Sequence, residues 1–435
     1  MRAVPVNAVA PDPVPSSIGK YHVLRELGRG ATANVYLARD PFVGREVAVK
    51  IFQHASGGAE LITGKHRASF LNEASLVGKL NHPHIVGLFD AAVEPHFSYV
   101  VMEFVPGGTL AQYATMEGLL PLEKVIEVVF KVSRALEYAH RHGVIHRDIK
   151  PANILVTEPF DVKLSDFGVA ILEGVTHTNI NAAGSPAYMS PEQLAEKALT
   201  HQTDIYSLGV VMFQLLTGRL PFTASSHAAL MYQIVNHDPP ALRALRPDLP
   251  ETFEAIVSRA LQKDLAARYQ NWIEFGRDLA GLLRHLESPR EGITDTHKFH
   301  TLRNMKFFRN FREVEIWETL RFASWERINP DTRIIAEGDH GDSIYLVAEG
   351  QAEVTRAGHL LAVLGSGDLF GEMIYLGENT ARSTTVRART PVTLVKIKVQ
   401  SLASSSDACQ AQFNKSFMQI LVRRLDESNR KLAGR

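Results

Sequence analysis

The sequence predicts an α+β protein in which a small β lobe and a larger helical lobe precede a β-barrel with flanking helices. Three observations predict this arrangement. Residues 21–52 alternate apolar and polar side chains between glycine turns, as strands do. After Leu110, apolar residues recur at three- and four-residue steps, as in amphipathic helices. Between Thr332 and Lys398, short alternating runs separated by turns favour an antiparallel barrel.

Composition narrows the class of protein. A chain of 435 residues is long enough for two or three cores, since a single core stops growing near ~250–300 residues. Lys+Arg and Asp+Glu both number 47, and this balance argues against a role of the whole protein on nucleic acid or a membrane surface. Cys409 is the single cysteine and excludes an internal disulfide. Without a membrane-spanning run or a signal peptide, a cytoplasmic protein is expected.

The domain boundaries follow changes in composition. Residues 1–19 are proline-rich and aperiodic, which predicts a disordered tail. The first domain is expected over 20–283, with a small lobe at 20–105 and a large lobe at 106–283. Residues 284–303 are polar, contain Pro and Gly, and are interpreted as a linker. The second domain is expected over 304–435, where Phe307 and its aromatic neighbours at helical steps indicate core packing and an amphipathic helix ends the chain.

Two features of the β lobe are typical of phosphate binding. Gly28 and Gly30 lie between two strand-like runs, and glycine lets a backbone approach phosphate oxygens closely. Lys50 follows at the end of the next strand. Each feature alone has a plainer interpretation, a hairpin turn for the glycines and a solvated edge charge for the lysine.

The run "HRDIKPAN", followed by "SDFG", decides between these interpretations. Asp148, Asn153 and Asp166 supply three oxygen-bearing side chains, and Mg²⁺ prefers a few such ligands with phosphate completing its shell. The motifs occur in one order behind a glycine loop and a strand lysine. Their combination is very improbable by chance and predicts phosphoryl transfer.

At these residues the chain resembles the eukaryotic-like (Hanks-type) Ser/Thr protein kinases over residues 20 to about 283. The resemblance implies a bilobal protein kinase fold that transfers the γ-phosphoryl group of ATP, with Mg²⁺, to Ser or Thr hydroxyls of protein substrates. Lys50 would hold the α- and β-phosphates and pair with Glu73. Asp148 would accept or orient the proton of the substrate hydroxyl, and Lys150 would steady the γ-phosphate. Asn153 and Asp166 would hold the metal.

The resemblance also assigns the remaining residues of this domain. Met102 would be the gatekeeper, before a hinge at Glu103–Val105, and Glu192 would pair with Arg268 in a structural role, as would Asp204. Ala33 replaces the third glycine of the family and Ser190 replaces an alanine, but neither change removes a catalytic group. The residues expected around ATP are Leu27, Gly28, Gly30, Val35, Ala48, Lys50, Met102, Glu103 and Val105.

Arg147 raises the question of control by phosphorylation. An arginine beside the catalytic aspartate can pair with a phosphate on the activation segment. Thr176 and Thr178 are the expected autophosphorylation sites. The alternative is a polar loop that never takes a phosphate.

The stretch "FGEMIYLGENTARSTTV" carries the second resemblance. A short helix after Gly371 would aim N–H groups at an anion, and Arg382 offers a planar fork to phosphate oxygens. From about residue 304 the chain resembles the cyclic nucleotide-binding domain family, which implies a jelly-roll-like barrel, a regulatory ligand such as cAMP or cGMP, and a contact from Glu372 to the ribose. The expected contacts are Gly371, Glu372, Met373, Arg382, Ser383 and Thr384.

Several alternatives remain open. Ile374 and Ala381 replace the usual Ala and Pro of that family, so Glu372 and Arg382 are alternatively a structural ion pair in a barrel without a ligand. The main hypothesis is a Ser/Thr protein kinase regulated by a cyclic nucleotide. One alternative is a constitutive kinase whose barrel serves docking or dimerisation, and another is a catalytically silent scaffold. No DNA-reading segment follows the last helix, so nucleic acid is not an expected partner.

Overall fold

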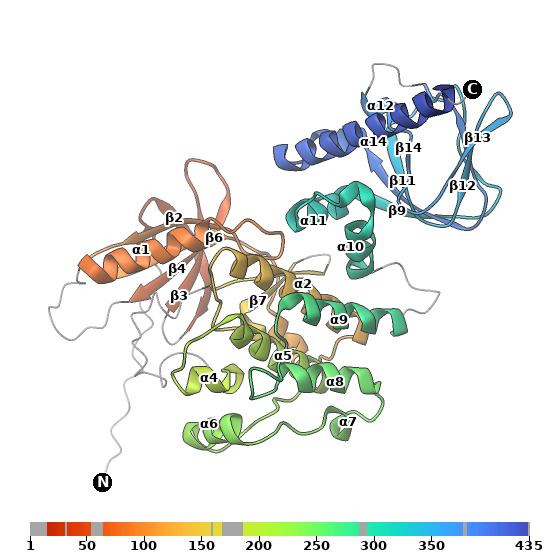
Figure 1. Ribbon diagram of the computed structural model, residues 1–435. Helices are drawn as coiled ribbons and strands as arrows, with labels where there is room; N and C mark the ends of the chain where they lie inside the picture. Colours follow the sequence, from red (N-terminus) through yellow and green to blue (C-terminus); the bar gives the residue numbers. More distant parts are fainter. Residues whose placement is uncertain are drawn as a thin grey trace, which may run out of the picture. The chain divides into compact units, whose positions relative to one another are not determined.

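The computed structural model describes residues 15–30, 33–53, 64–157, 160–167, 186–286, 294–376 and 381–433, without the side chains of 64–66, 283–286, 376 and 424–433. The chain divides into two compact units, Met1–Leu286 and Glu287–Arg435 (Figure 1). Each unit has its own core and is described by itself.

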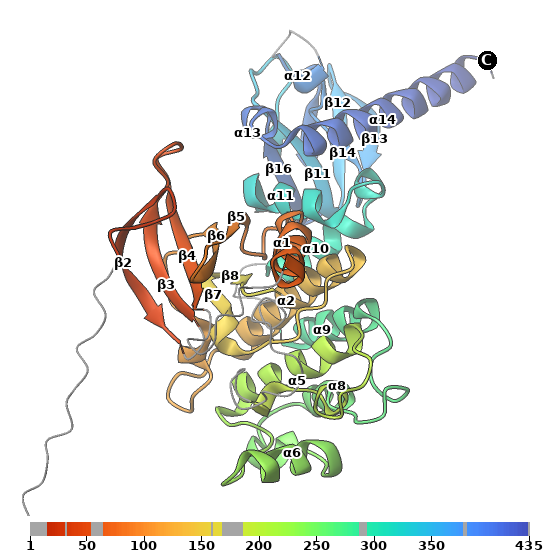
Figure 2. The same cartoon turned by 90° about the vertical axis from the view of Figure 1, so that its left-hand side faces the viewer.

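The first unit begins with an antiparallel sheet of six strands among the described residues, in the order β1-β2-β3-β4-β6-β5 (Figure 2). One face buries Tyr36, Val49 and Val101 in a core that also holds Tyr21. The other face packs Phe52 and Val100 against Phe70 of helix α1 (Gly64–Gly78). The strands are β1 (Ser17–Ile18), β2 (Tyr21–Arg29), β3 (Ala33–Arg39), β4 (Glu46–Gln53), β5 (Leu88–Val93) and β6 (Phe97–Glu103).

Helices make up most of the rest of this unit. Helix α2 (Leu122–Arg141) is fully buried along Val125, Val129 and Val132, because it lies in contact with both α5 and α9. Helix α5 begins at a Thr200 cap and ends at Gly218, whose φ of 70° suits glycine. The other elements are η1 (Leu110–Tyr113), η2 (Pro151–Asn153), β7 (Ile154–Thr157), β8 (Asp161–Leu164), η3 (Pro186–Tyr188), α4 (Pro191–Leu194), α5 (His201–Thr217), α6 (His227–Asn236), α7 (Leu242–Leu245), α8 (Glu251–Ala260) and α9 (Trp272–Leu286).

The second unit contains two antiparallel four-stranded sheets within its described residues, in the orders β10-β15-β12-β13 and β14-β11-β16-β9. Both sheets contribute to one core, with Val347 and Leu394 from one sheet and Ala352 and Val386 from the other. The expected antiparallel barrel is therefore confirmed. Its strands are β9 (Ala323–Ile328), β10 (Arg333–Ile335), β11 (Ser343–Glu349), β12 (Ala352–Arg356), β13 (His359–Leu364), β14 (Leu369–Phe370), β15 (Thr385–Ala388) and β16 (Val392–Lys398).

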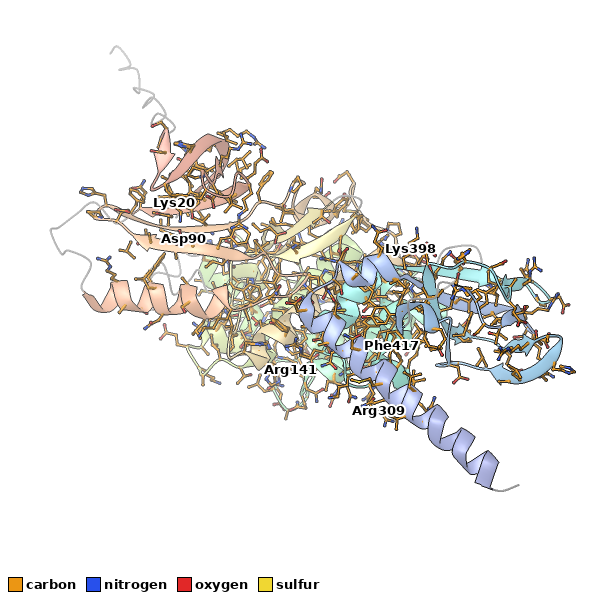
Figure 3. All side chains as sticks on the ribbon, turned by 90° about the horizontal axis from the view of Figure 1, so that it is seen from above. Lys20, Asp90, Arg141, Arg309, Lys398 and Phe417 are labelled. Atoms are coloured by element: carbon orange, nitrogen blue, oxygen red, sulfur yellow. The ribbon has the colours of Figure 1, made fainter. Side chains whose placement is uncertain are left out.

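An aromatic cluster joins the helices that flank the barrel. Phe307, Phe308 and Phe311 meet Phe413 and Phe417 of the last helix, with ring centroids 4.8–6.1 Å apart. Phe417 is labelled in Figure 3. The expectation that these aromatic residues form a core is confirmed. The helices are α10 (Asp295–Asn304), η4 (Lys306–Phe308), α11 (Glu313–Phe322), α12 (Met373–Leu376), α13 (Val399–Ala403) and α14 (Asp407–Ala433).

The linker expected over 284–303 is too long. Helix α9 continues to Leu286, and α10 begins at Asp295 after Thr294, whose side chain accepts a hydrogen bond from the N–H of His297. Phe299 and Leu302, three residues apart, share one face of α10, and the Phe299 ring stacks on Trp317 at 4.7 Å. Tertiary packing of this face stabilises a helix that its polar composition does not indicate.

Membrane-spanning helices are not found in the described part of the chain, where every helix is too short or too polar to cross a bilayer.

Candidate functional site

The register of the first sheet gathers several of the residues expected around ATP. Val35 lies opposite Lys50 across β3 and β4, and Ala48 lies opposite Met102 across β4 and β6. Directly paired residues point to the same face of a sheet, and Ala48 and Lys50 share a face because they are two positions apart. Gly28 pairs with Val35 on the other side. The strands thus place a lysine and apolar side chains on one surface.

The other expected residues border this surface. Leu27 lies in β2, and the N–H of Gly30 donates to the carbonyl of Ala33 at 2.8 Å. Glu103 ends β6 and makes an ion pair with Lys163, with 2.7 Å between Oε1 and Nζ. Val105 is buried just beyond the strand. The segment 102–105 therefore connects the β lobe to the helical lobe.

Lys50 makes an ion pair with Asp166, with 3.0 Å between Nζ and Oδ1. Both side chains are largely shielded, with exposed fractions of 14% and 21%. The pair joins strand β4 to the segment after β8. The expected pair between Lys50 and Glu73 is not formed among the described residues of this structure.

Glu73 instead lies on α1 without a lysine partner. Its Oε2 is buried and has no hydrogen-bond partner in the described part of the chain. Burial raises the pKa of Glu73 to about 7, and the positive charge of Arg147 only partly opposes this effect. The Asp166 carboxylate holds the Lys50 ammonium group instead.

The loop after α2 concentrates hydrogen bonds on Asp148. Its Oδ2 accepts from Lys150 Nζ at 2.7 Å and from Asn153 Nδ2 at 2.9 Å. The same Asn153 amide also donates to the backbone carbonyl of Asp148 at 2.8 Å. Three side chains from an eight-residue motif are thus held together, with an exposed fraction of 38% for Asp148. Its carboxylate is fixed and partly open to solvent.

Backbone hydrogen bonds tie this loop to the segment that carries Asp166. The ring of His146 pairs with the carbonyl of Ser165 at 2.8 Å, and Ser165 donates to the carbonyl of Asn153 through both its N–H and its hydroxyl. Arg147 and Asp166 adopt φ values of 70° and 61°, which non-glycine residues rarely adopt. Such strain persists where the surroundings enforce it, often at functional sites.

Asp204 holds the same loop through its buried carboxylate. Its carboxylate accepts hydrogen bonds from the backbone N–H groups of His146 and Arg147, both at 2.9 Å, and pairs with the His140 ring at 2.7 Å. Complete burial would raise the pKa of Asp204, but the hydrogen bond from His140 and the charges of His140 and His146 hold it below its ordinary value. The structural role expected for Asp204 has this physical basis.

The donor set at Asn153 and Asp166 fits Mg²⁺. Lys50 bonds to Oδ1 of Asp166, and the side-chain hydrogen bonds of Asn153 use Nδ2, so Oδ2 of Asp166 and Oδ1 of Asn153 have no hydrogen-bond partner within the described residues. The residues that the structure describes contain no cluster of three or more His, Cys, Asp and Glu side chains suited to a metal ion. Two hard oxygens suit an ion that takes its other ligands from phosphate and water.

A buried ion pair supports the helical lobe behind the loop. Arg268 Nη1 lies 2.7 Å from Glu192 Oε1, and Arg268 is fully buried. Its remaining donors reach the carbonyls of Gln202 and Gln262. Burial would raise the pKa of Glu192, but the hydrogen bond and charge of Arg268 hold it below its ordinary value. The expected pairing of Glu192 with Arg268 is confirmed.

The expected phosphorylation sites cannot be placed. Thr176 and Thr178 lie outside the described residues. Arg147, the expected partner of such a phosphate, has a buried Nε without a hydrogen-bond partner in the described part of the chain.

In the second unit, Arg382 is buried against backbone carbonyls. Its Nη2 donates to the carbonyl of Ser343 at 2.8 Å and its Nη1 to the carbonyl of Gly371 at 3.2 Å. Burial lowers the pKa of Arg382, against the opposing charges of Tyr345, Asp342 and Glu372. A Cβ at Gly341 would collide with the guanidinium, so this glycine makes room for it.

The other residues expected to contact a cyclic nucleotide lie at 371–373 and directly after Arg382. Gly371 has a φ of 78° and directly precedes the buried Glu372. Met373 begins α12 and is 55% exposed, while Ser383 is exposed and Thr384 half-buried after Arg382. The short helix expected after Gly371 is present. The alternative is a structural ion pair between Glu372 and Arg382. It is supported by the charge of Glu372, which raises the pKa of Arg382 against the effect of burial. The hydrogen bonds of Arg382 given above run to backbone carbonyls instead.

A contact that the sequence analysis missed joins α12 to α14. The hydroxyl of Tyr375 donates to Asn414 Oδ1 at 2.8 Å, and its ring lies 5.0 Å from that of Phe417. Gly341 was also missed as a site residue. The Gly-Asp pair at 341–342 signals a turn, but nothing in the sequence indicates that an arginine 41 positions later fills the space above it.

Comparisons with known proteins agree with this geometry. The model of the protein kinase domain family matches residues 21–273, and that of the cyclic nucleotide-binding domain family matches residues 325–406. Relatives include the probable serine/threonine-protein kinase PknB of Lactococcus lactis, 38% identical over 60% of this chain and 42% of its own length. PrkC of Bacillus subtilis is 38% identical over 60% of this chain and 40% of that protein.

PknL of Mycobacterium tuberculosis is also similar, with 34% identity over 65% of this chain and 71% of the relative. Among solved structures, Rad53 residues 1–466 in complex with AMP-PNP has a TM-score of 0.50 and 27% identity, over 60% of this chain and 64% of that chain. The chain spans about two fifths of the length of PknB and PrkC.

Proposed function

Since this chain belongs to the protein kinase family and also carries a cyclic nucleotide-binding domain, we propose that it is a Ser/Thr protein kinase regulated by a cyclic nucleotide. The reaction is transfer of the γ-phosphoryl group of ATP to Ser or Thr hydroxyls of other proteins. The observation that carries the proposal is the convergence of Lys150 and Asn153 on the Asp148 carboxylate, tied through Ser165 to the segment of Asp166.

In this reaction Asp148 accepts or orients the proton of the attacking hydroxyl. The carboxylate is fixed by two hydrogen bonds to one oxygen, which leaves Oδ1 for the substrate. Lys150, 2.7 Å from Asp148, is placed to steady negative charge on the transferring group. A lysine at this position of the loop also supports a preference for Ser and Thr over Tyr acceptors. Positioning and electrostatic stabilisation supply most of the rate enhancement in phosphoryl transfer.

Asn153 and Asp166 are the residues that would hold Mg²⁺, which neutralises charge on the phosphate oxygens when bound. Lys50 holds the α- and β-phosphates, and Ala48, Val35 and Met102 form the apolar surface for the adenine ring. In this scheme Lys50 must exchange Asp166 for Glu73. The exchange places the ionised Glu73 beside a cation, so its buried carboxyl gains the partner that it now lacks among the described residues.

Autophosphorylation at Thr176 or Thr178 is part of this proposal. A phosphate there would meet Arg147, whose buried Nε is unsatisfied within the described residues. A bidentate arginine–phosphate contact would also draw Arg147 away from Glu73. Phosphosite mapping after incubation with ATP tests this step, and it fails if neither threonine is modified.

The second domain is proposed to be the input. The cyclic phosphate would take the guanidinium donors of Arg382 that now reach the carbonyls of Ser343 and Gly371. Glu372 would accept from the ribose 2′-hydroxyl. Because Tyr375 of α12 contacts Phe417 and Asn414 of α14, a shift of the phosphate-binding segment reaches the last helix directly.

Regulation requires that the nucleotide prefer one conformation of the protein. A tenfold preference corresponds to about 1.4 kcal/mol. Kinase assays on the full chain with and without cAMP and cGMP test the proposal, together with Tyr375→Phe, which removes the bond to Asn414. We expect the variant to bind nucleotide like the wild type but to show a smaller change in rate. Equal rates with and without either nucleotide would show that neither cAMP nor cGMP regulates the kinase.

A further inference from the structure

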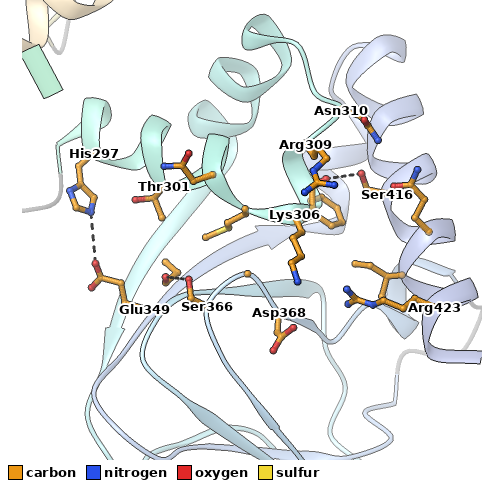
Figure 4. Close-up of a pocket in the computed structure, with 17 residues that line it drawn as sticks. His297, Thr301, Lys306, Arg309, Asn310, Glu349, Ser366, Asp368, Ser416 and Arg423 are labelled. Carbon is orange, nitrogen blue, oxygen red and sulfur yellow. Dashed lines mark hydrogen bonds and ion pairs between the residues drawn. The ribbon is translucent and has the colours of Figure 1, made fainter. Parts of the chain in front are cut away.

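A cavity of about 660 Å³ lies in the second unit (Figure 4). Arg382 is not among the residues that line it. Its walls come from α10, η4, the end of β11, the turn 365–368 and α14. The volume falls within the range of about 300–1,000 Å³ that is usual for small-molecule sites. Nothing in the proposed kinase reaction or in the proposed cyclic nucleotide site uses these residues.

The two ends of the cavity differ in charge. At one end His297 and Glu349 face each other at 3.9 Å. At the other end Lys306, Arg309 and Arg423 line the wall together with Asp368, so cationic side chains outnumber the carboxylate. Figure 4 shows the side chains of Lys306 and Arg423 directed into the space beside Asp368. The carboxylate of Asp368 accepts a hydrogen bond from the N–H of Gly365 at 2.9 Å.

Two of these cations have no counter-ion among the described residues. Within the part of the chain that the structure describes, neither Lys306 nor Arg309 makes an ion pair or a side-chain hydrogen bond. Between them Phe307 is buried, and Met305 and Ile420 add apolar surface to the lining. The cavity therefore combines an apolar wall with a cationic end.

We propose that this cavity binds an organic phosphate, a phosphomonoester on an apolar or ring-shaped body. A phosphomonoester dianion matches the charge of Lys306 and Arg309, and its oxygens suit both the ammonium of Lys306 and the guanidinium fork of Arg309, with Arg423 beside them in the lining. The apolar body would lie against Met305 and Ile420. The proposal does not depend on kinase activity or on nucleotide binding at Arg382.

Such a ligand would bridge separate elements. Lys306 belongs to η4 and Arg423 to α14, while the turn at Asp368 leads within three residues to Gly371. Binding here stabilises the contact of α14 with η4. If α14 also responds to a ligand at Arg382, the two sites are coupled, and each ligand changes the affinity of the other by the same factor.

Isothermal titration calorimetry of the full chain with 2-naphthyl phosphate at low ionic strength tests the proposal. 2-Naphthol and 2-naphthoate, which carry the same ring with no charge and with one negative charge, serve as control compounds. We expect measurable binding of the phosphate, with at least tenfold weaker binding of both other probes. Lys306→Glu and Arg423→Glu should each weaken phosphate binding at least tenfold, and Asp368→Asn should strengthen it.

Arg389→Glu is the matched control, because it makes the same charge change at an exposed arginine outside the lining of the cavity. It should leave the affinity within twofold of the wild type. The proposal is overturned if 2-naphthyl phosphate does not bind, if 2-naphthoate binds equally well, or if Arg389→Glu weakens binding as much as Lys306→Glu. Binding that survives Lys306→Glu but is lost in Arg382→Ala or Lys50→Met would place the probe in another site and equally overturn it.

Discussion

Lys50 and Asp166 form an ion pair of 3.0 Å across 116 positions of the sequence. The pair joins the β lobe to the segment beside the catalytic loop and leaves Glu73 of α1 without its expected partner. The surface proposed for ATP and the proposed metal ligand are thus linked. What distinguishes this arrangement from the one proposed for catalysis is the partner of a single lysine.

The first prediction concerns Asp148. Asp148→Asn keeps the size of the side chain and an acceptor for Lys150, but removes the carboxylate that accepts or orients the hydroxyl proton. We expect kcat to fall by about 10²–10⁴-fold with little change in the KM for ATP. Initial rates of phosphate transfer to a protein substrate measure this effect. Asp264→Asn, an exposed change, should retain full activity; an unimpaired Asp148→Asn enzyme would remove Asp148 from the mechanism.

The second prediction follows from the pKa of Glu73, which burial raises from 4.5 to about 7. Below pH 4.5 the carboxyl is protonated in the folded and unfolded states and carries no penalty. Between pH 4.5 and 7 only the unfolded chain ionises, so the folded state loses stability as the pH rises. Above pH 7 the full penalty remains.

Glu73→Gln removes this penalty and provides the measurement. We expect the stability of the variant relative to the wild type, from urea denaturation, to increase between pH 4.5 and 7 and then level off. The variant should also lose kinase activity, because Gln cannot form the proposed ion pair with Lys50. A stability difference that is independent of pH would mean that Glu73 is solvated.

The third prediction concerns the buried pair of Arg268 and Glu192. Arg268→Met leaves an uncompensated carboxylate in the helical lobe, and such a loss costs about 3–5 kcal/mol of stability. Chemical denaturation followed by circular dichroism measures the change. Adding Glu192→Gln to Arg268→Met should restore part of the loss. An Arg268→Met variant as stable as the wild type would show that the pair contributes nothing to the free energy of unfolding.

The fourth prediction concerns the proposed cyclic nucleotide site. Arg382→Ala should weaken binding of cAMP or cGMP at least tenfold, since one charge-assisted hydrogen bond contributes about 1.5–3 kcal/mol. Gly371→Ala should act similarly, because its φ is 78° and its Cβ would lie 2.5 Å from Arg382 Nη1. Calorimetry on the full chain measures both. Arg387→Ala, at an exposed arginine of β15, is the control and should bind normally.

The sequence predicted the parts of the molecule that depend on local pattern. Alternation in β2 to β4, helical spacing in α2 and α5, and alternation in the barrel strands all correspond to the observed elements. The motif around Asp148 was sufficient to group Lys150 and Asn153, because eight consecutive residues of one loop have few ways to fold back on a carboxylate. The pairing of Glu192 with Arg268 came from family resemblance and is present.

What the sequence could not predict depends on long-range competition. The family resemblance implied that Glu73 pairs with Lys50, but it does not reveal that Asp166 occupies the lysine. Residues 295–303 are polar and suggest a linker, yet packing of Phe299 on Trp317 stabilises a helix there. Similarly, an arginine in a binding motif does not reveal the carbonyls of Ser343 and Gly371 that hold it in this structure.

Phosphate transfer from ATP to a protein substrate, followed by mass spectrometry of the acceptor and repeated with cAMP and with cGMP, tests the central claim most directly. We predict phosphoserine or phosphothreonine in the product, no transfer by Lys50→Met, and a rate that one of the nucleotides changes in the wild type but not in Arg382→Ala. Absence of ATP-dependent transfer by the folded wild-type chain, or undiminished transfer by Lys50→Met, would contradict the account.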